Sequence, residues 1–499
     1  MVLRRVKILF VSVILILAML CTKLLYIGIY KHGEYSAEVF NQQQRETRLE
    51  KVRGQITDKN GIPFTDRSQK TVYIGNGGKI SAKGSVGANV PKRYEPNGIA
   101  AHAVGYITDD SNGVSGAEKI YNSFLESSGY YRATYLADGS GTPFANQKPE
   151  VVLKKEDSPK SVTLTIDYHI QKIAEKIADK KVEQGAIVVL DAKSFDVLAM
   201  VSRPGFDRNS VEAYLSSEKG ELLNRALCGY NAGSVFKIIT SAAILDKYPD
   251  YISKKFHCSG MTKLGDKSFA CHEALGHGDI DFFDGFSHSC NCVFYESGIE
   301  IGAGEIYAAA KKLGLGEKIL FWNEESEGNI THKSEYSLFE TVNMSIGQGD
   351  VLITPLQCAV VAATVANGGV RKSVNIAGAV IDDNGTELQH LKQSQSIRVM
   401  KESTAKTIGS MMRQCVISGT AKKALDTSIA GKTGSAETGW LTSDGKTAVH
   451  GWFCGYFPFD NPQYAMAVFC ENGQSGAGSC VEPFIEIYEE IDKIYPFKQ

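Results

Sequence analysis

The chain has 499 residues, of which 43% are hydrophobic and 22% are charged, close to the averages of globular proteins. These values exclude a disordered, collagen-like or coiled-coil protein, and the length leaves room for roughly two to four domains. The 54 Lys and Arg residues nearly balance the 56 Asp and Glu residues, so the charge gives no sign of a nucleic-acid partner. The 11 cysteines are too few for a disulfide scaffold, and their odd number leaves at least one thiol unpaired within the chain.

An apolar segment near the N-terminus predicts a single-pass membrane anchor. Residues 8–30 are interrupted by one charge, Lys23, and as a helix they can span a hydrocarbon core of about 30 Å. Three basic residues precede the segment, so the positive-inside rule predicts residues 1–7 as a cytoplasmic tail and the rest of the chain outside the cell membrane. A cleaved signal peptide is the alternative, but the expected small-residue cleavage site is missing.

Residues 31–155 predict a small, mostly β domain, here called the pedestal. This stretch is rich in Gly and polar residues and contains no long amphipathic helix pattern. The sequence Lys-Asn-Gly at residues 59–61 indicates a hairpin turn between two short apolar runs. A charged stretch at 154–160 predicts a hinge before the second domain, which we place at residues 161–499.

The second domain has an α+β pattern. Asp167 can cap an amphipathic helix, and two strand-like runs follow between residues 186 and 201. A predicted hairpin at 451–471 precedes a closing amphipathic helix behind Pro483. The long stretch between these ends is mostly helical in pattern. This order predicts an antiparallel sheet flanked by terminal helices, with an inserted all-α lobe.

The first of three short motifs runs from Ser234 to Lys237, directly after Gly233 and at the start of an apolar run. A serine hydroxyl is a weak nucleophile unless a base takes its proton, and a lysine with a lowered pKa on the same helix face can be that base. The helix N-terminus also offers backbone N–H groups to an oxyanion. Alone the motif is weak, because Ser216 and Lys219 repeat its spacing in a polar stretch.

The second motif is Ser289-Cys290-Asn291. Alternation of side chains would place the serine and the asparagine on one side and the cysteine on the other. A hydroxyl and an amide on one side can relay a proton and hold a substrate amide. By itself, a serine two residues before an asparagine is a chance pattern.

The third motif is Lys432-Thr433-Gly434-Ser435, next to the predicted hairpin. A glycine in a strand lets a substrate backbone lie beside it, while the lysine and the hydroxyl groups can bind a carboxylate. The plain alternative is a glycine-rich edge strand with a solvated lysine. The three motifs together, in this order and spacing, match the serine acyl-transferases that bind penicillin.

Further strings narrow this resemblance to class B penicillin-binding proteins. Stretches that resemble conserved elements of that family lie at residues 53–61, 113–118, 164–171, 345–349, 354–357, 366–369 and 452–456. Departures are few: Ala232 stands where the family usually has proline, and Phe195 where it usually has a turn glycine. Neither change removes a reacting group.

The resemblance implies the penicillin-binding transpeptidase fold and a monofunctional D,D-transpeptidase that cross-links peptidoglycan and is acylated by β-lactams. Ser234 would attack a stem peptide ending in D-Ala-D-Ala, with Lys237 as general base. Ser289, tuned by Lys237 and Lys432, would pass the proton to the leaving D-Ala.

Roles in substrate binding follow from the same resemblance. Thr433 and Ser435 would hold the terminal carboxylate, Gly434 would leave room for the substrate backbone, and Asn291 would bind the peptide amide. The reaction would require no cofactor.

The resemblance also implies a polytopic membrane glycan polymerase as partner, in cell elongation, cell division or spore formation. Related enzymes with the same motifs, β-lactamases and D,D-carboxypeptidases, are disfavoured by the anchor and pedestal. A β-lactam sensor would need a cytoplasmic signalling region, and an inactive scaffold would be expected to lose a motif residue.

A second candidate site lies around the second motif. Three thiolates and one imidazole can form a closed, structural zinc site. The predicted ligands are Cys258, Cys271, His277 and Cys290, with His272 and Cys292 as substitutes. The alternatives are a group of buried free thiols or a disulfide between the first two cysteines.

Overall fold

The computed structural model describes the whole chain except residues 82–85, 97, 155–158, 442–444, 446 and 498–499. The central part of the predicted hinge at 154–160 therefore lies outside the described residues. The chain forms two compact units: Met1–Val52 with Ser68–Lys92 and Ser127–Ser158, and Arg53–Arg67 with Arg93–Glu126 and Pro159–Gln499. Two segments of the predicted pedestal thus pack with the larger unit. The domain boundaries at 31–155 and 161–499 stay predictions.

The smaller unit begins with two helices, α1 (Val2–Ile29) and α2 (His32–Gln43). Among the described residues, α1 is the one helix long and apolar enough to cross a membrane, with a mean hydropathy of 2.7 over its most apolar window. The rest of the unit is mostly β, as predicted. Its two sheets have the orders β1-β6-β7 and β4-β3-β5. Their bounds are Gln44–Arg53 (β1), Glu126–Leu136 (β6), Glu150–Lys154 (β7), Ile80–Ser81 (β4), Ser68–Ile74 (β3) and Val86–Lys92 (β5).

The larger unit is built on a five-stranded antiparallel sheet of order β10-β9-β23-β22-β21. The strands are Gly185–Asp191 (β9), Val197–Arg203 (β10), Ala430–Leu441 (β21), Thr447–Phe457 (β22) and Tyr464–Cys470 (β23). The predicted hairpin at 451–471 is confirmed as β22 and β23, and β21, which carries the third motif, is an edge strand. In β9 every residue but the last is buried, because helices cover both faces of the sheet.

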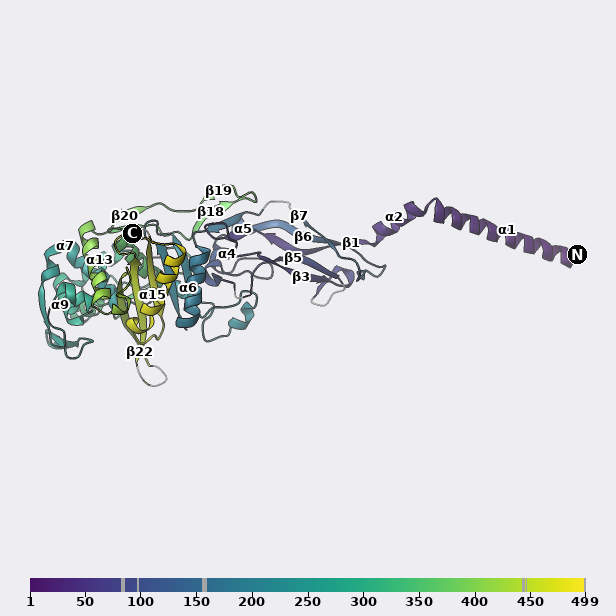
Figure 1. Cartoon of the computed structure of the whole chain (residues 1–499). Helices are drawn as coiled ribbons and strands as arrows, with labels where there is room; N and C mark the ends of the chain where they lie inside the picture. Colours follow the sequence, from purple (N-terminus) through teal and green to yellow (C-terminus); the bar gives the residue numbers. More distant parts are fainter. Residues whose placement is uncertain (82–85, 97, 155–158, 442–444, 446, 498–499) are drawn as a thin grey trace. The chain divides into compact units, whose positions relative to one another are not determined.

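Helices α6 (Tyr168–Lys181) and α15 (Val481–Ile494) lie together on one face of this sheet (Figure 1). Asp167 caps α6 as predicted, because its carboxylate accepts hydrogen bonds from the backbone N–H groups of His169 and Ile170. From α15, Phe484 packs its ring against Phe453 of β22, at 4.7 Å between ring centroids. The opposite face is covered by the buried helix α12 (Pro355–Ala366).

The inserted lobe is mostly helical, but it is not all-α as predicted. Its helices are α7 (Lys237–Lys247), α8 (Phe282–Ser287), α9 (Asn291–Ile301), α10 (Ala303–Lys312), α11 (Leu338–Ser345) and α13 (Glu402–Ile417). Two short antiparallel pairs interrupt them: β12 (Lys255–Cys258) with β15 (Gly278–Asp281), and β13 (Met261–Leu264) with β14 (Lys267–Ala270). These short strands escape a periodicity argument because each has only four residues.

The remaining elements complete the larger unit. A four-stranded sheet consists of β2 (Ile56–Thr57), β8 (Ser161–Leu164), β18 (Ala377–Ile381) and β19 (Glu387–His390). Two strand pairs are β11 (Tyr230–Asn231) with β16 (Leu352–Ile353) and β17 (Val370–Lys372) with β20 (Ser396–Arg398). The short helices are α3 (Ala101–Val104), α4 (Gly116–Ile120), α5 (Asn122–Leu125) and α14 (Gly476–Ser479).

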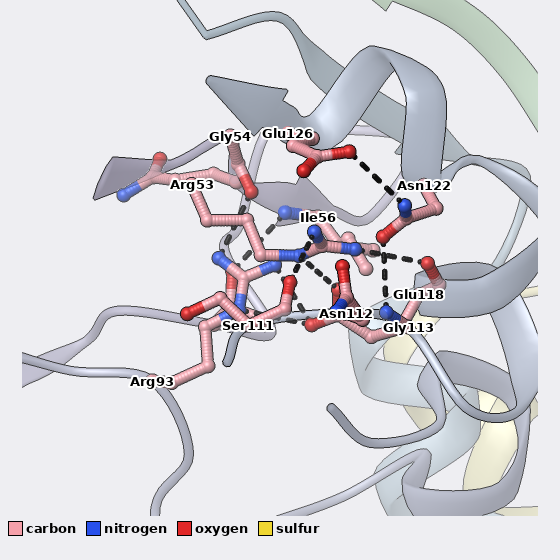
Figure 2. Close-up of polar contacts among 12 residues, drawn as sticks. Arg53, Gly54, Ile56, Arg93, Ser111, Asn112, Gly113, Glu118, Asn122 and Glu126 are labelled. Carbon is pink, nitrogen blue, oxygen red and sulfur yellow. Dashed lines mark hydrogen bonds and ion pairs between the residues drawn. The ribbon is translucent and has the colours of Figure 1, made fainter. Parts of the chain in front are cut away.

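Three segments that are separated in sequence meet in a buried ion-pair network (Figure 2). The guanidinium of Arg53 donates to Glu118 Oε2 at 2.7 Å, and that of Arg93 donates to Glu118 Oε1 at 2.9 Å. Tyr94 Oη also donates to Glu118 Oε1, at 2.9 Å. The side chain of Glu118 is fully buried. Burial acts to raise the pKa of Glu118, but Arg93 and Arg53 outweigh it, so the pKa lies below its ordinary value.

We expect Glu118→Gln to lower the free energy of unfolding by about 3–5 kcal/mol, because the buried guanidinium of Arg53 loses its counter-charge and that of Arg93 is left with Asp66. Since the folded-state pKa of Glu118 is depressed, its contribution is present above the ordinary value of 4.5 and is lost as the pH falls below it. Denaturation of the full-length chain in detergent checks both effects. Glu490→Gln, which breaks an exposed pair with Lys493, should cost at most about 0.5 kcal/mol.

Candidate active site

Ser234 lies in a short 3₁₀ turn, Gly233–Phe236, that runs directly into α7. The turn enters through Gly233, whose φ of +56° favours glycine. A Cβ on Gly233 would lie 2.5 Å from the carbonyl oxygen of Ser435, so only glycine permits this approach. The turn before the first motif therefore depends on glycine at this position. It also brings the first motif against the third.

The third motif contacts the same turn from the edge of the sheet. A Cβ on Gly434 would lie 3.1 Å from the backbone nitrogen of Val235 and 3.2 Å from Cβ of Trp452. Lys432 and Thr433 are buried, whereas Ser435 is exposed. The hydroxyl of Ser435 accepts a hydrogen bond from the backbone N–H of Gly476 at 3.3 Å.

In the second motif Ser289 and Asn291 lie on one side and Cys290 on the other, as predicted, but the backbone is not extended. Ser289 has a φ of +58°, and α9 begins at Asn291. Both residues turn toward Lys237, while the thiol of Cys290 lies 3.9 Å from that of Cys271 on the other side. The side chains are therefore separated because a left-handed residue precedes the start of a helix. The alternation of an extended strand was expected instead.

Lys237 joins the first motif to the second. Its Nζ lies 2.7 Å from the carbonyl oxygen of Ser289 and 2.8 Å from Oδ1 of Asn291, and both of these atoms can only accept. The third neighbour, at 3.3 Å, is the hydroxyl of Ser289, which can donate. All three partner oxygens can accept a hydrogen bond, so they hold the amine between Ser289 and Asn291.

The surroundings of Lys237 disfavour its charged form. Lys237 is fully buried, and burial together with the charge of Lys432 holds its pKa well below the ordinary value. Burial also lowers the pKa of Lys432, whose Nζ donates to the carbonyl oxygen of Thr433 at 3.1 Å. The hydroxyl of Ser234 makes no hydrogen bond within the described residues. The low-pKa amine of Lys237 and the hydroxyl of Ser289 thus form a pair that can transfer a proton, and Lys237 lies three residues along the chain from Ser234.

Four of the predicted metal ligands form a compact cluster behind the second motif. The donor atoms of Cys258, Cys271, His277 and Cys290 all lie within 4.8 Å of one another. Cys271 Sγ is 3.9 Å from Cys290 Sγ and 3.7 Å from Nδ1 of His277. Tetrahedral zinc with Zn–S bonds of about 2.3 Å would place its sulfurs about 3.8 Å apart, so the donor set fits this ion.

The substitute ligands also lie near this cluster. His272 Nδ1 is 3.8 Å from Cys271 Sγ. Thiol hydrogen bonds with Cys290 and Cys292 lower the pKa of Cys271, and the contact with Cys271 in turn raises the pKa of Cys290. Burial lowers the pKa of His277, which keeps its imidazole neutral, as metal binding requires.

Sequence reasoning missed several residues that support the site. The hydroxyls of Thr420 and Thr433 are hydrogen-bonded to each other. The rings of Phe294 and Phe286 lie under the two buried amines, at 5.1 Å from Lys237 Nζ and 5.6 Å from Lys432 Nζ. None of the three missed residues belongs to a motif, so no local signal marks them.

Residues 185–489 match the family described as penicillin binding protein transpeptidase domain. The chain is 27% identical over 463 residues to stage V sporulation protein D of Bacillus subtilis, which covers 89% of this chain and 69% of that protein. It is 26% identical over 462 residues to peptidoglycan D,D-transpeptidase MrdA of Acinetobacter baumannii, which covers 78% of this chain and 64% of that protein. The chain therefore spans about two thirds of the length of these curated relatives.

Solved structures resemble the chain over most of its length. PBP2 of Pseudomonas aeruginosa matches with a TM-score of 0.68 and 25% identity, over 89% of this chain and 96% of that one. Penicillin-binding protein A of Mycobacterium tuberculosis, solved as its penicillin G acyl-enzyme complex, matches with a TM-score of 0.70 and 22% identity, over 88% of this chain and 99% of that one. The predicted penicillin-binding transpeptidase fold is confirmed.

We expect Gly434→Ala to lower the free energy of unfolding by about 1–3 kcal/mol, because its Cβ would press against Val235 and Trp452. The matched control is Gly304→Ala in α10, where a Cβ meets no atom within 4 Å. This change should instead stabilise the helix, by about 0.5–1 kcal/mol. Denaturant titration of both variants compares them, and equal effects would contradict the close packing of the two motifs.

Proposed function

The chain belongs to the penicillin-binding protein transpeptidase family, and on this premise we propose that it is a serine D,D-transpeptidase that cross-links peptidoglycan stem peptides. The observation that carries the proposal is the burial of Lys237 against Ser289 and Asn291, which lowers its pKa and so favours an amine that can accept a proton. Peptidoglycan D,D-transpeptidase is also the name of the relative in Acinetobacter baumannii.

Acylation begins at Ser234. Its oxygen attacks the carbonyl carbon of the penultimate D-Ala, and its proton passes to the lone pair of Lys237. The negative charge that develops on the carbonyl oxygen is met by the backbone N–H groups of Ser234 and Ser435. The first N–H groups of a helical turn have no acceptor within the turn, which supports this role for Ser234.

Ser289 connects the buried amine to the leaving group. Its hydroxyl lies beside Lys237 Nζ, so the proton taken from Ser234 can pass through it to the nitrogen of the departing D-Ala. Lys432 contributes by its charge, which helps to keep Lys237 a weak base. The ester bond to Ser234 forms and the D-Ala amide bond breaks.

Substrate binding falls to the edge strand and the start of α9. Thr433 and Ser435 hold the terminal carboxylate with their hydroxyls, and Asn291 binds the peptide amide. Gly434 allows β21 to lie close to the turn that carries Ser234. An amine of a neighbouring stem peptide then attacks the ester and completes the cross-link.

A β-lactam enters the same steps as an acylating analogue. Its ring amide takes the place of the D-Ala amide, and the opened ring stays attached to Ser234 because no leaving group departs to make room for an acceptor. Penicillin-binding protein A of Mycobacterium tuberculosis has been solved as such a penicillin G acyl-enzyme.

The chain is a single-pass membrane protein with its N-terminus in the cytoplasm. The apolar helix α1 and the basic residues before the most apolar part support this orientation. Its partner is a polytopic glycan polymerase. A peptidoglycan synthase complex that coordinates polymerization and crosslinking contains a chain with a TM-score of 0.73 and 23% identity, covering 99% of each chain.

The cysteine cluster binds a structural zinc ion. Its four donors have the type and spacing of a closed tetrahedral site, in which the ion would tie three separate segments of the lobe together. Cys290 is a ligand and its two neighbours contact Lys237, so this site holds the second motif in place from behind. The reaction itself uses no cofactor.

We expect Ser234→Ala to abolish covalent labelling by a fluorescent penicillin, because the attacking oxygen is removed. Ser216→Ala is the matched control, since Ser216 has the same spacing to a lysine in an exposed stretch, and it should label like the wild type. Gel fluorescence after denaturation measures both. A label retained on Ser234→Ala would refute the nucleophile, and rapid loss of the label from the wild type would favour a β-lactamase.

We expect the purified full-length chain to contain about one equivalent of zinc by elemental analysis, and Cys290→Ser to lose most of it. The same variant should unfold at a lower temperature. Cys228→Ser, at a half-buried thiol outside the cluster, is the control and should keep both the metal and the stability. Less than a few tenths of an equivalent in the wild type would contradict the zinc site.

A further inference from the structure

A short loop joins β23 to α15, and a cysteine lies at each of its ends. Cys470 is the last residue of β23, and Cys480 directly precedes α15. Both side chains are buried in the same core cluster, on the face of the sheet that α15 covers. Between them, residues 471–479 are half-buried or exposed, except for Gly476. The two thiols are therefore the buried ends of an outer loop.

The two thiols lie on the same face of the sheet and contact each other. Cys470 pairs directly with Gly451 of β22, so a side chain at position 451 would point to the same face as that of Cys470. A Cβ on Gly451 would lie 3.2 Å from Cys480 Sγ. Cys470 Sγ is 3.7 Å from the carbonyl oxygen of Ser479, and the thiols of Cys470 and Cys480 are hydrogen-bonded to each other. The structure holds them as free thiols, the reduced form of such a pair.

The middle of the same loop packs against the third motif. A Cβ on Gly476 would lie 2.3 Å from the carbonyl oxygen of Gly434 and 2.2 Å from that of Trp452. The backbone N–H of Gly476 donates to Ser435 Oγ at 3.3 Å. The loop thus supports β21 at the hydroxyl to which we assign the substrate carboxylate.

The surroundings of the pair favour oxidation. In the proposed topology the larger unit lies outside the membrane, where disulfide bonds form and persist. The proposed zinc ligands Cys258, Cys271 and Cys290 belong to a different core cluster, so oxidation of this pair leaves them free to bind metal. A bond between the ends of a loop removes open conformations of the chain and so stabilises the folded loop.

We propose that Cys470 and Cys480 form a disulfide bond that closes the loop and holds Gly476 against the third motif. The bond itself does not depend on the proposed function, whereas its effect on substrate binding at Ser435 does.

The oxidant is a disulfide outside the membrane, either a small molecule or an exported oxidoreductase. The thiolate of one cysteine attacks a sulfur of the oxidant, which forms a mixed disulfide and releases one thiol of the oxidant. The thiolate of the other cysteine attacks the protein sulfur of the mixed disulfide, and the second thiol of the oxidant leaves. The two cysteines lose two electrons and two protons, and the oxidant takes up both. Because both thiols are buried in the folded chain, the exchange occurs before the loop packs on the sheet.

Peptide mapping of the full-length chain tests the bond. Chain exported through its own α1 is purified in detergent and warmed with glutathione disulfide to just below its melting temperature, where loops open. It is then alkylated in denaturant and digested with trypsin and Glu-C protease, which cuts after Glu471, between the two cysteines. We expect the peptide of residues 447–471 to be joined to the peptide that begins at Asn472, two hydrogen atoms lighter than their sum.

Two variants and one control define this result. Cys470→Ser and Cys480→Ser should each abolish the joined peptides, which also excludes a bond from Cys454. Cys228→Ser, at a half-buried thiol outside the loop, should keep them. Wild-type chain with both cysteines alkylated, or with glutathione attached to either one, would overturn the inference.

Reduction separates a covalent bond from the mere packing of two thiols. The phosphine reductant TCEP should lower the melting temperature of the oxidised wild type by about 3–5 °C and leave that of Cys470→Ser unchanged. An equal shift in both, or no shift in the wild type, would contradict the bond.

Penicillin labelling tests the effect on the site. The reduced wild type should be acylated about two- to fivefold more slowly than the oxidised one, because the support of Ser435 loosens. Equal rates would overturn the link to the third motif. If neither form is acylated, the proposed function fails while the joined peptides still establish the bond.

Discussion

Two lysine side chains, Lys237 and Lys432, are removed from solvent in one region of the larger unit, and the cost of burying two like charges shapes everything around them. An isolated buried ammonium is so unfavourable that the group releases its proton instead. Burial and the second positive charge of Lys432 both hold the pKa of Lys237 well below its ordinary value. The base strength of the site is therefore a property of packing and not of any one residue.

The packing in turn depends on close backbone contacts between distant segments. Gly233 and Gly434 allow the turn that carries Ser234 and the edge strand β21 to approach within distances that a Cβ would prevent. The same approach leaves the outer edge of β21 beside Ser234. An unpaired strand edge of this kind can accept an extended peptide.

The second motif carries conformational strain that its surroundings hold. A left-handed φ at a residue other than glycine costs on the order of 1–3 kcal/mol and persists only where neighbouring contacts enforce it. The left-handed conformation of Ser289 is held from both sides, by the hydrogen bonds of Lys237 and by the cysteine cluster that contains Cys290. The zinc that we propose would link the stability of this cluster to the geometry of the proton path.

Local patterns in the sequence were enough to predict the apolar N-terminal helix, the cap at Asp167, the hairpins, the sheet with its terminal helices and the three motifs, because capping, turn chemistry and hydrophobic period act over a few residues. They also predicted that Ser289 and Cys290 point to opposite sides, but from an extended backbone that the structure does not have. Only the tertiary structure placed Thr420 beside Thr433, put short strands into the lobe, and moved parts of the expected pedestal into the larger unit. Those features depend on which distant segments pack together, and no short-range pattern encodes that choice.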